Sequence, residues 1–367
     1  MLGVGAEVRP TEVLGDRMAM LRKPASAGQD GARQAPVLGR RALLRALGLT
    51  CAIGLLGMPE KLWAAPKQET QSKVSKTEQS TLGTTIWLGL EHAPFAGLPP
   101  YNDDTVIVFV PSYYRLPKNG MIDAVLHFHG HNTTAEHALE QSALREQLAA
   151  SKQNAILVVP QGPINQPDSA GGKLEQDKGL RKLLRELTSA LGERAATKVL
   201  GPASCKGAKA VGMLCLSAHS GGFHVAAACL LRGGHEVSET YLFDALYGDS
   251  PAFQAWVLDR KGRHGRDRHK LISYFTGGKT RDNNLTLYTA LRTLGVECLL
   301  EEQPGALSRA QLTKTTAAFL SAGLSHADVT FGHNNLRDCL FASGLKRTVP
   351  SDWFEAAKGP RSLDAKG

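Results

Sequence analysis

Ser220 lies in the pentapeptide AHSGG, which spans residues 218–222 and follows the apolar run 212–217. Apolar residues then recur at helical spacing from 222 to 232, so the pentapeptide joins a predicted strand to a predicted helix. A serine nucleophile must project from such a sharp turn, and small neighbours let the turn close. The helix offers N–H groups and the positive end of its dipole to a developing oxyanion. The pentapeptide predicts Ser220 as a nucleophile, with a purely structural Ser-Gly-Gly turn as the alternative.

Three histidines, His127, His129 and His131, alternate at the end of the predicted strand 123–129. Alternate side chains of a strand project to one face, so these imidazoles could share a zinc ion. The pattern is similar to the His-x-His-x-Asp-His of metallo-β-lactamase-like enzymes, but Asn132 stands beside His131 and no aspartate fits. A zinc site is therefore an alternative prediction. The favoured prediction, a serine nucleophile at Ser220, includes no metal or other cofactor.

Gly130 lies within the histidine segment, and His333 follows a glycine just after the predicted last strand, 327–330. Together with the Ser220 pentapeptide, these segments resemble the α/β-hydrolase family, in which the triad residues follow in the order Ser, Asp, His. The resemblance implies that His333 is the general base that takes the proton from Ser220 and returns it to the leaving group.

The resemblance also implies an oxyanion hole between the His-Gly segment and the nucleophile turn. Backbone N–H groups near His131 and at Gly221 would stabilise the oxyanion. Gly130 has no side chain and would let the main chain approach the substrate closely. Some esterases of the family carry a run of glycines here, whereas this chain carries one.

Two aspartates are candidates for the triad acid. Asp282 follows the predicted strand 270–275, where most of the family carries its acid, but it also precedes a predicted helix and could be a cap. Asp244 is the last residue of the apolar run 240–244, where a minority of the family carries it. We favour Asp244, because a strand end fixes its position directly, and keep Asp282 as the alternative.

Short apolar runs alternate with amphipathic stretches from about residue 83 onward. Predicted strands are 85–90, 105–111, 123–129, 155–160, 212–217, 240–244, 270–275 and 327–330, and predicted helices are 135–151, 179–191, 222–232, 251–258, 285–295 and 309–322. Strands that are apolar on both faces and alternate with helices indicate a mostly parallel sheet covered on both sides. The expected fold is an α/β-hydrolase domain over 83–345 with eight strands. The long polar loop within 160–175 is expected to contact substrate, with a disordered excursion as the alternative.

The amino-terminal region resembles a twin-arginine export signal. Arg40 and Arg41 precede an apolar run of about 13 residues, which is shorter than the roughly 20 that span a bilayer. Residues 1–65 are therefore predicted to be a signal peptide, with an uncleaved anchor as the alternative. The polar stretch 66–82 is predicted to be a flexible tether, 346–367 a C-terminal tail, and the mature protein periplasmic or secreted.

The composition is that of an ordinary globular protein, with 42% hydrophobic and 21% charged residues in 367. The net charge of +9 is not concentrated enough to predict nucleic-acid binding. Five cysteines lie beyond the signal, and Cys215 and Cys229 are expected to be buried. The sequence predicts an exported serine hydrolase acting on a small-molecule or polymer ester, with no stable membrane span in the mature chain. The alternatives are a zinc hydrolase and a non-catalytic binding protein with a hydrolase shell.

Overall fold

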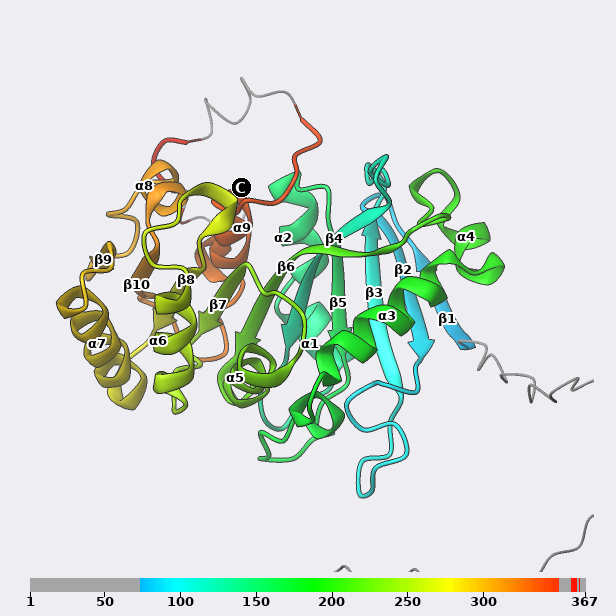
Figure 1. The fold of residues 1–367 in the computed structure, drawn as a ribbon, viewed down its shortest axis with the longest axis horizontal. Helices are drawn as coiled ribbons and strands as arrows, with labels where there is room; N and C mark the ends of the chain where they lie inside the picture. Colours follow the sequence, from blue (N-terminus) through cyan, green and yellow to red (C-terminus); the bar gives the residue numbers. More distant parts are fainter. Residues whose placement is uncertain (1–72, 350–357, 362, 364–367) are drawn as a thin grey trace, which may run out of the picture. The chain divides into compact units, whose positions relative to one another are not determined.

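The computed structural model describes residues 73–349, 358–361 and 363. A central sheet has the strand order β1-β2-β3-β5-β4-β6-β7-β8-β10-β9 (Figure 1). Its strands are β1 (Lys73–Gln79), β2 (Gly83–Gly89), β3 (Thr105–Pro111), β4 (Met121–Phe128), β5 (Ile156–Pro160), β6 (Ala210–His219), β7 (Glu239–Phe243), β8 (Lys270–Phe275), β9 (Cys298–Glu301) and β10 (Ala317–Ser321). The pairs β1–β2, β2–β3 and β3–β5 are antiparallel, and all the other pairs are parallel.

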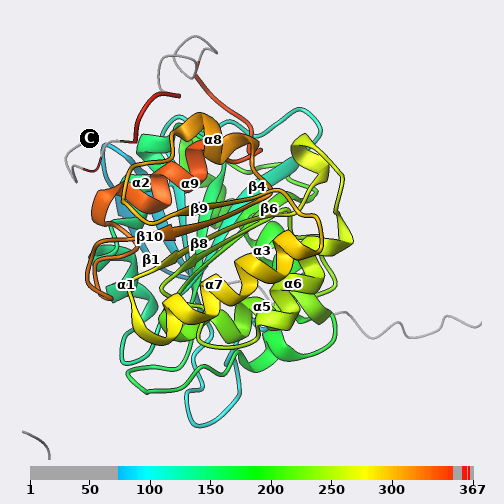
Figure 2. The same ribbon diagram turned by 90° about the vertical axis from the view of Figure 1, so that its left-hand side faces the viewer.

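Helices cover both faces of this sheet. They are α1 (Ala135–Gln141), α2 (Leu144–Ser151), α3 (Gly179–Gly192), α4 (Arg194–Leu200), α5 (Phe223–Arg232), α6 (Ser250–Asp259), α7 (Gly278–Thr293), α8 (Arg309–Lys314) and α9 (Asn335–Phe341). Short 3-10 helices are η1 (Gly172–Glu175), η2 (Gly201–Ala203), η3 (Ser220–Gly222), η4 (Gly265–Asp267) and η5 (Gly332–Asn334). Figure 2 shows α5, α6 and α7 on one side of the sheet and α2, α8 and α9 on the other.

Strand side chains alternate between two apolar layers. In β6, Leu214, Leu216 and Ala218 belong to the layer under α3–α7, whereas Cys215 belongs to the layer under α1, α2, α8 and α9. All four side chains are fully buried, which explains the continuous apolar run in the sequence. The predicted α/β class, with a mostly parallel sheet covered on both faces, is confirmed.

Three parts of the predicted organisation are wrong, and the described sheet has ten strands where eight were predicted. The stretch 66–82, predicted to be a flexible tether, contains β1, which is paired with β2 along its length. The stretch 309–322, predicted to be one helix, is α8 followed by β10. Residues 327–330 form a turn and no strand. The last strand before the carboxyl terminus of the described chain is therefore β10, which ends at Ser321.

The remaining predictions concern the signal, the tail, membrane spans and the cysteines. The predicted signal, 1–65, lies outside the described residues. Part of the predicted tail, 346–367, is described, and its Arg361 is 6% exposed. Among the described residues, no helix is both long and apolar enough to cross a bilayer. The five cysteines in this part of the chain are free thiols, and Cys215 and Cys229 are buried as expected.

Candidate active site

Ser220 begins a tight turn between β6 and α5. Its φ of 51° is in the left-handed region, which costs free energy for a residue with a side chain and is typical of strained functional turns. Two glycines leave room for this turn. A Cβ on Gly130 would lie 2.7 Å from the Ser220 Cβ, and a Cβ on Gly222 would lie 2.6 Å from the Phe128 carbonyl oxygen. The predicted requirement for small residues therefore arises because the turn packs against the end of β4.

His326 is the imidazole that contacts Ser220. Its Nε2 lies 2.9 Å from the Ser220 Oγ, and its Nδ1 lies 2.6 Å from the Asp244 Oδ2. His326 stands on the loop after β10, whereas Asp244 directly follows β7. The three side chains form one hydrogen-bonded series at the carboxyl ends of parallel strands, where sites form in open α/β sheets.

The Asp244 carboxylate is buried, and its side chain is 2% exposed. Burial alone would raise the pKa of this carboxyl, but hydrogen bonds from His326, Thr280 and Thr276 outweigh it and lower the pKa to about 2. The Thr276 N–H donates to Oδ1 at 3.0 Å and its hydroxyl to Oδ2 at 2.7 Å, while the Thr280 hydroxyl also donates to Oδ1. Asp244 is therefore an anion that holds the His326 Nδ1 proton.

His333 and Asp282 are not part of this series. His333 lies in η5, and no hydrogen bond joins it to Ser220 or Asp244 among the described residues. The imidazole that contacts Ser220 is therefore that of His326 and not that of His333, the predicted base. Asp282 is an exposed residue within α7, and its carbonyl oxygen accepts a bond from the hydroxyl of Thr286 in the next turn. Of the two candidate acids, the structure brings Asp244 to the histidine.

The histidine segment does not form a metal site. The buried His127 ring contacts the Ser217 hydroxyl through Nδ1 at 2.8 Å, and burial lowers its pKa to about 3. The His129 Nδ1 donates to the Gly130 carbonyl oxygen at 2.8 Å, and its Nε2 accepts from the Gly162 N–H at 2.9 Å. No group of three or more His, Cys, Asp or Glu in the described chain is arranged to hold a metal ion. The zinc alternative is therefore not supported.

The His131 ring lies against Gly221, in the turn that begins at Ser220. A Cβ on Gly221 would lie 2.2 Å from the His131 Cδ2, so only glycine leaves room for this ring. The ring is held by the Ser169 hydroxyl, 2.7 Å from Nε2. The structure thus brings Gly130 and His131 next to Ser220 and Gly221, as the resemblance implied.

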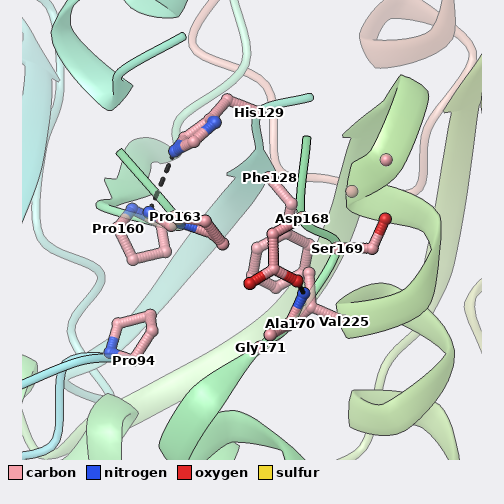
Figure 3. A pocket seen from close by; sticks show the side chains of 13 residues that line it. Pro94, Phe128, His129, Pro160, Pro163, Asp168, Ser169, Ala170, Gly171 and Val225 are labelled. Atoms are coloured by element: carbon pink, nitrogen blue, oxygen red, sulfur yellow. Dashed lines mark hydrogen bonds between the residues drawn. The ribbon is translucent and has the colours of Figure 1, made fainter. Parts of the chain in front are cut away.

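A pocket opens beside Gly221 and Gly222, with about 330 Å³ of empty space, part of it open to solvent (Figure 3). Its apolar walls are formed by Pro94, Phe128, Pro160, Pro163, Ala170 and Val225. Asp168 and Ser169 also line it, so the loop within 160–175 forms part of the wall. The pocket touches the residue that follows Ser220, which places it next to the hydrogen-bonded series.

Asp168 is the acidic residue of the pocket wall. Its Oδ2 accepts a hydrogen bond from the Tyr101 hydroxyl at 2.5 Å, and its Oδ1 accepts from the Ala170 N–H at 2.9 Å. The bond from Tyr101 lowers the pKa of the carboxyl. The pocket is therefore apolar with one negative charge in its wall.

Comparison by sequence finds no matching family model and no matching curated protein. Comparison by structure finds a mutant feruloyl esterase module from Clostridium thermocellum complexed with sinapinate, at 12% identity and TM-score 0.39, covering 75% of this chain and 88% of that one. A ferulic acid esterase has 15% identity and TM-score 0.40, with 74% and 98% covered. The S-formylglutathione hydrolase from Staphylococcus aureus has 10% identity and TM-score 0.39, with 70% and 95% covered. The functional conclusion below therefore rests on the geometry of the site itself.

Proposed function

We propose that this protein is a serine hydrolase that cleaves an ester through an acyl-enzyme. The observation that carries the proposal is the hydrogen-bonded series from Ser220 through His326 to Asp244. A hydroxyl, an imidazole and a buried carboxylate in this order are the groups that activate a serine nucleophile, whatever fold presents them.

Each group has a defined task in the proposed reaction. The His326 Nε2 takes the Ser220 proton as the Oγ attacks the ester carbonyl, and it then gives that proton to the departing alcohol. Water repeats the cycle on the acyl-enzyme, which releases the acid and restores the serine. Asp244 keeps the proton on Nδ1, so that Nε2 is free to accept, and it stabilises the imidazolium that forms.

The oxyanion would form between the two segments that meet at the nucleophile turn. The N–H groups of Gly221 and His131 are the proposed donors, each contributing about 3 kcal/mol to the transition state. Gly130 leaves room for the substrate carbonyl because a side chain there would collide with Ser220. The amino end of α5 adds its positive dipole at the same place.

The pocket beside Gly221 is the proposed site for the acyl group. Phe128 and Val225 offer apolar surface, and burying that surface favours a hydrophobic acyl chain or ring. The anionic Asp168 in the wall disfavours an acyl group that itself carries a carboxylate. The proposed substrates are therefore esters of neutral, largely apolar acids.

The test of the function is the mass of the intact protein after exposure to a fluorophosphonate probe. We expect one adduct, mapped to Ser220, and its loss in Ser220→Ala together with turnover. Ser112→Ala is the matched control, because Ser112 is an exposed serine that follows β3, at the end of the sheet opposite the site. Full turnover in a folded Ser220→Ala variant, or activity that disappears with a chelator, would overturn the proposal. A folded protein with neither adduct nor turnover would favour the non-catalytic shell.

Export to the periplasm or the medium is also proposed, from the arginine pair before the apolar run. Conservative replacement of the pair, Arg40→Lys with Arg41→Lys, should leave the protein in the cytoplasm, because twin-arginine signals depend on both arginines. Fractionation of cells that express the full chain measures this. Normal export of the double variant would contradict the twin-arginine assignment.

A further inference from the structure

His219 is a half-buried polar group that the proposed reaction does not use. It is the last residue of β6 and immediately precedes Ser220. Its Nε2 lies 2.9 Å from the carbonyl oxygen of His326, and the two imidazole rings pack with their centroids 4.8 Å apart. The ring therefore joins the strand that carries the nucleophile to the main chain of the residue that contacts it.

The same ring also lies against the His-Gly turn. A Cβ on Gly130 would be 3.2 Å from the His219 Nδ1, so the turn packs directly on the imidazole. His219 thus touches the segment of the proposed oxyanion hole as well as the loop of the proposed base. One side chain contacts all three segments that must keep their relative positions during catalysis.

The bond to His326 defines which nitrogen carries the proton. A carbonyl oxygen only accepts, so Nε2 of His219 must donate. Burial, together with the neighbouring His326, lowers the pKa of His219 to about 4, although the bond to the carbonyl opposes this shift. At neutral pH the ring is uncharged and adds no positive charge beside the base.

The loop that carries His326 needs such an attachment. His326 and its neighbours 325 and 327 are exposed, and exposed loops open with little cost in free energy. The bond that the His326 Nδ1 donates to the Asp244 carboxylate fixes the rotation of the imidazole, but it does not fix the height of the loop above Ser220. The bond from His219 acts on the main chain and holds the loop at that height.

We propose that His219 is a positioning residue that clamps the main chain of His326 to the strand carrying Ser220. The inference rests on the proposed serine hydrolase function and adds to it a residue that touches neither substrate nor the transferred proton. A displacement of about 1 Å between a base and its nucleophile costs on the order of 100-fold in rate. The clamp should therefore affect the chemical step and leave substrate binding largely intact.

The test compares His219→Leu, which keeps the bulk and removes the donor, with His219→Gln, whose amide N–H can reach the same carbonyl. We expect His219→Leu to lower kcat about 10- to 100-fold with KM changed less than twofold, and the rate of fluorophosphonate labelling to fall in parallel. His219→Gln should recover most of that loss. If His219→Leu does not fold, His219→Asn takes its place, because its shorter amide does not reach the carbonyl.

Three results would overturn the clamp: wild-type kcat in the folded Leu or Asn variant, a Gln variant no better than Leu, or a loss confined to KM. These outcomes are separate from failure of the function itself. Failure of the wild-type protein to react with fluorophosphonate, or activity in Ser220→Ala, would refute the serine mechanism whatever the His219 variants do. If fluorophosphonate labels the wild type and labels His219→Leu at the same rate, only the clamp is refuted.

Discussion

The His326 Nε2 lies 2.9 Å from the Ser220 Oγ, although the two residues are 106 positions apart in the chain. β6 and its turn position the serine, whereas the loop after β10 positions the imidazole. Two parallel strands, β7 and β8, lie between β6 and β10 in the sheet, and Asp244 at the end of β7 bridges the gap. The geometry of the site therefore depends on the order of the strands as much as on the three side chains.

The first prediction separates the two candidate bases. His326→Ala should lower kcat/KM by roughly 10⁴-fold or more, because it removes the group hydrogen-bonded to the nucleophile. His333→Ala should retain kcat/KM within a few fold. Steady-state kinetics on one ester, with circular dichroism to confirm folding, measures both. The reverse order of effects would restore His333 as the base and refute the assignment of His326.

The second prediction concerns Asp244 and pH. The folded-state pKa of about 2 is lower than the ordinary 3.8, so the carboxylate stabilises the fold above about pH 4 and loses that contribution as the pH falls toward 2. The free energy of unfolding should thus fall more steeply between pH 4 and pH 2 in the wild type than in Asp244→Asn. Urea titrations across this range measure the difference, and parallel pH curves would contradict the prediction.

The substitution Asp244→Asn should also slow the reaction. Asp244→Asn should lower kcat by roughly 10⁴-fold at neutral pH, because an amide no longer enforces the productive tautomer of His326. Asp282→Asn is the control and should keep near-normal kcat, since Asp282 is exposed on α7. A large loss in the control with a small loss in Asp244→Asn would return the role of triad acid to Asp282.

The third prediction concerns the charge in the pocket wall. The wild type should hydrolyse an ester with a carboxylate on its acyl group more slowly than a neutral ester of the same length. Asp168→Asn should narrow that ratio of kcat/KM values by about fivefold, which corresponds to roughly 1 kcal/mol for a partly exposed pair of charges. Asp177→Asn removes an exposed carboxylate outside the pocket, with its side chain 78% exposed, and should leave the ratio unchanged. An unchanged ratio in Asp168→Asn would place the acyl group elsewhere.

The fourth prediction concerns stability at the carboxyl end of the chain. The Arg361 guanidinium pairs with the Glu301 carboxylate, and the two side chains are 2% and 0% exposed. Arg361→Ala should lower the free energy of unfolding by about 3–5 kcal/mol, because it leaves a carboxylate buried without its cation. Lys76→Ala breaks the exposed pair with Glu136 and should cost less than about 1 kcal/mol. Equal losses of unfolding free energy in the two variants would show that the pair of Arg361 and Glu301 does not anchor the segment around Arg361.

The sequence was sufficient to locate the turn at Ser220 and the aspartate of the hydrogen-bonded series. Ser220 follows a largely apolar strand and is followed by two glycines, which are local properties. Asp244 ends another apolar run, so its position follows from the end of β7. Both inferences needed only short-range patterns and the rule that sites form at the carboxyl ends of parallel strands.

His326, the proposed base, was missed because one strand was mistaken for part of a helix. The capping box of Ser308 and Gln311 correctly indicates the start of α8, but the run Ala317–Ser321 is too short for periodicity to distinguish a strand from a helix. Reading it as helix moved the expected last strand to 327–330 and the expected base to His333. The two consecutive threonines before the run were the available signal that the helix had ended.

β1 was missed for a different physical reason. Six of its seven residues are exposed, with Val74 as the half-buried exception, so it lacks the apolar pattern that reveals a strand. Its structure depends on backbone pairing with β2, which composition does not reveal. A polar stretch next to a strong strand is therefore as compatible with an edge strand as with a flexible linker.

The polar surface of β1 has a consequence for how copies of the molecule meet. An exposed edge strand presents unpaired N–H and C=O groups, on which the sheet of another molecule could continue. Lys73, Lys76 and Glu78 place charged side chains along this strand. Extending the sheet there would require these charges to lose solvent, so β1 protects the molecule against edge-to-edge aggregation.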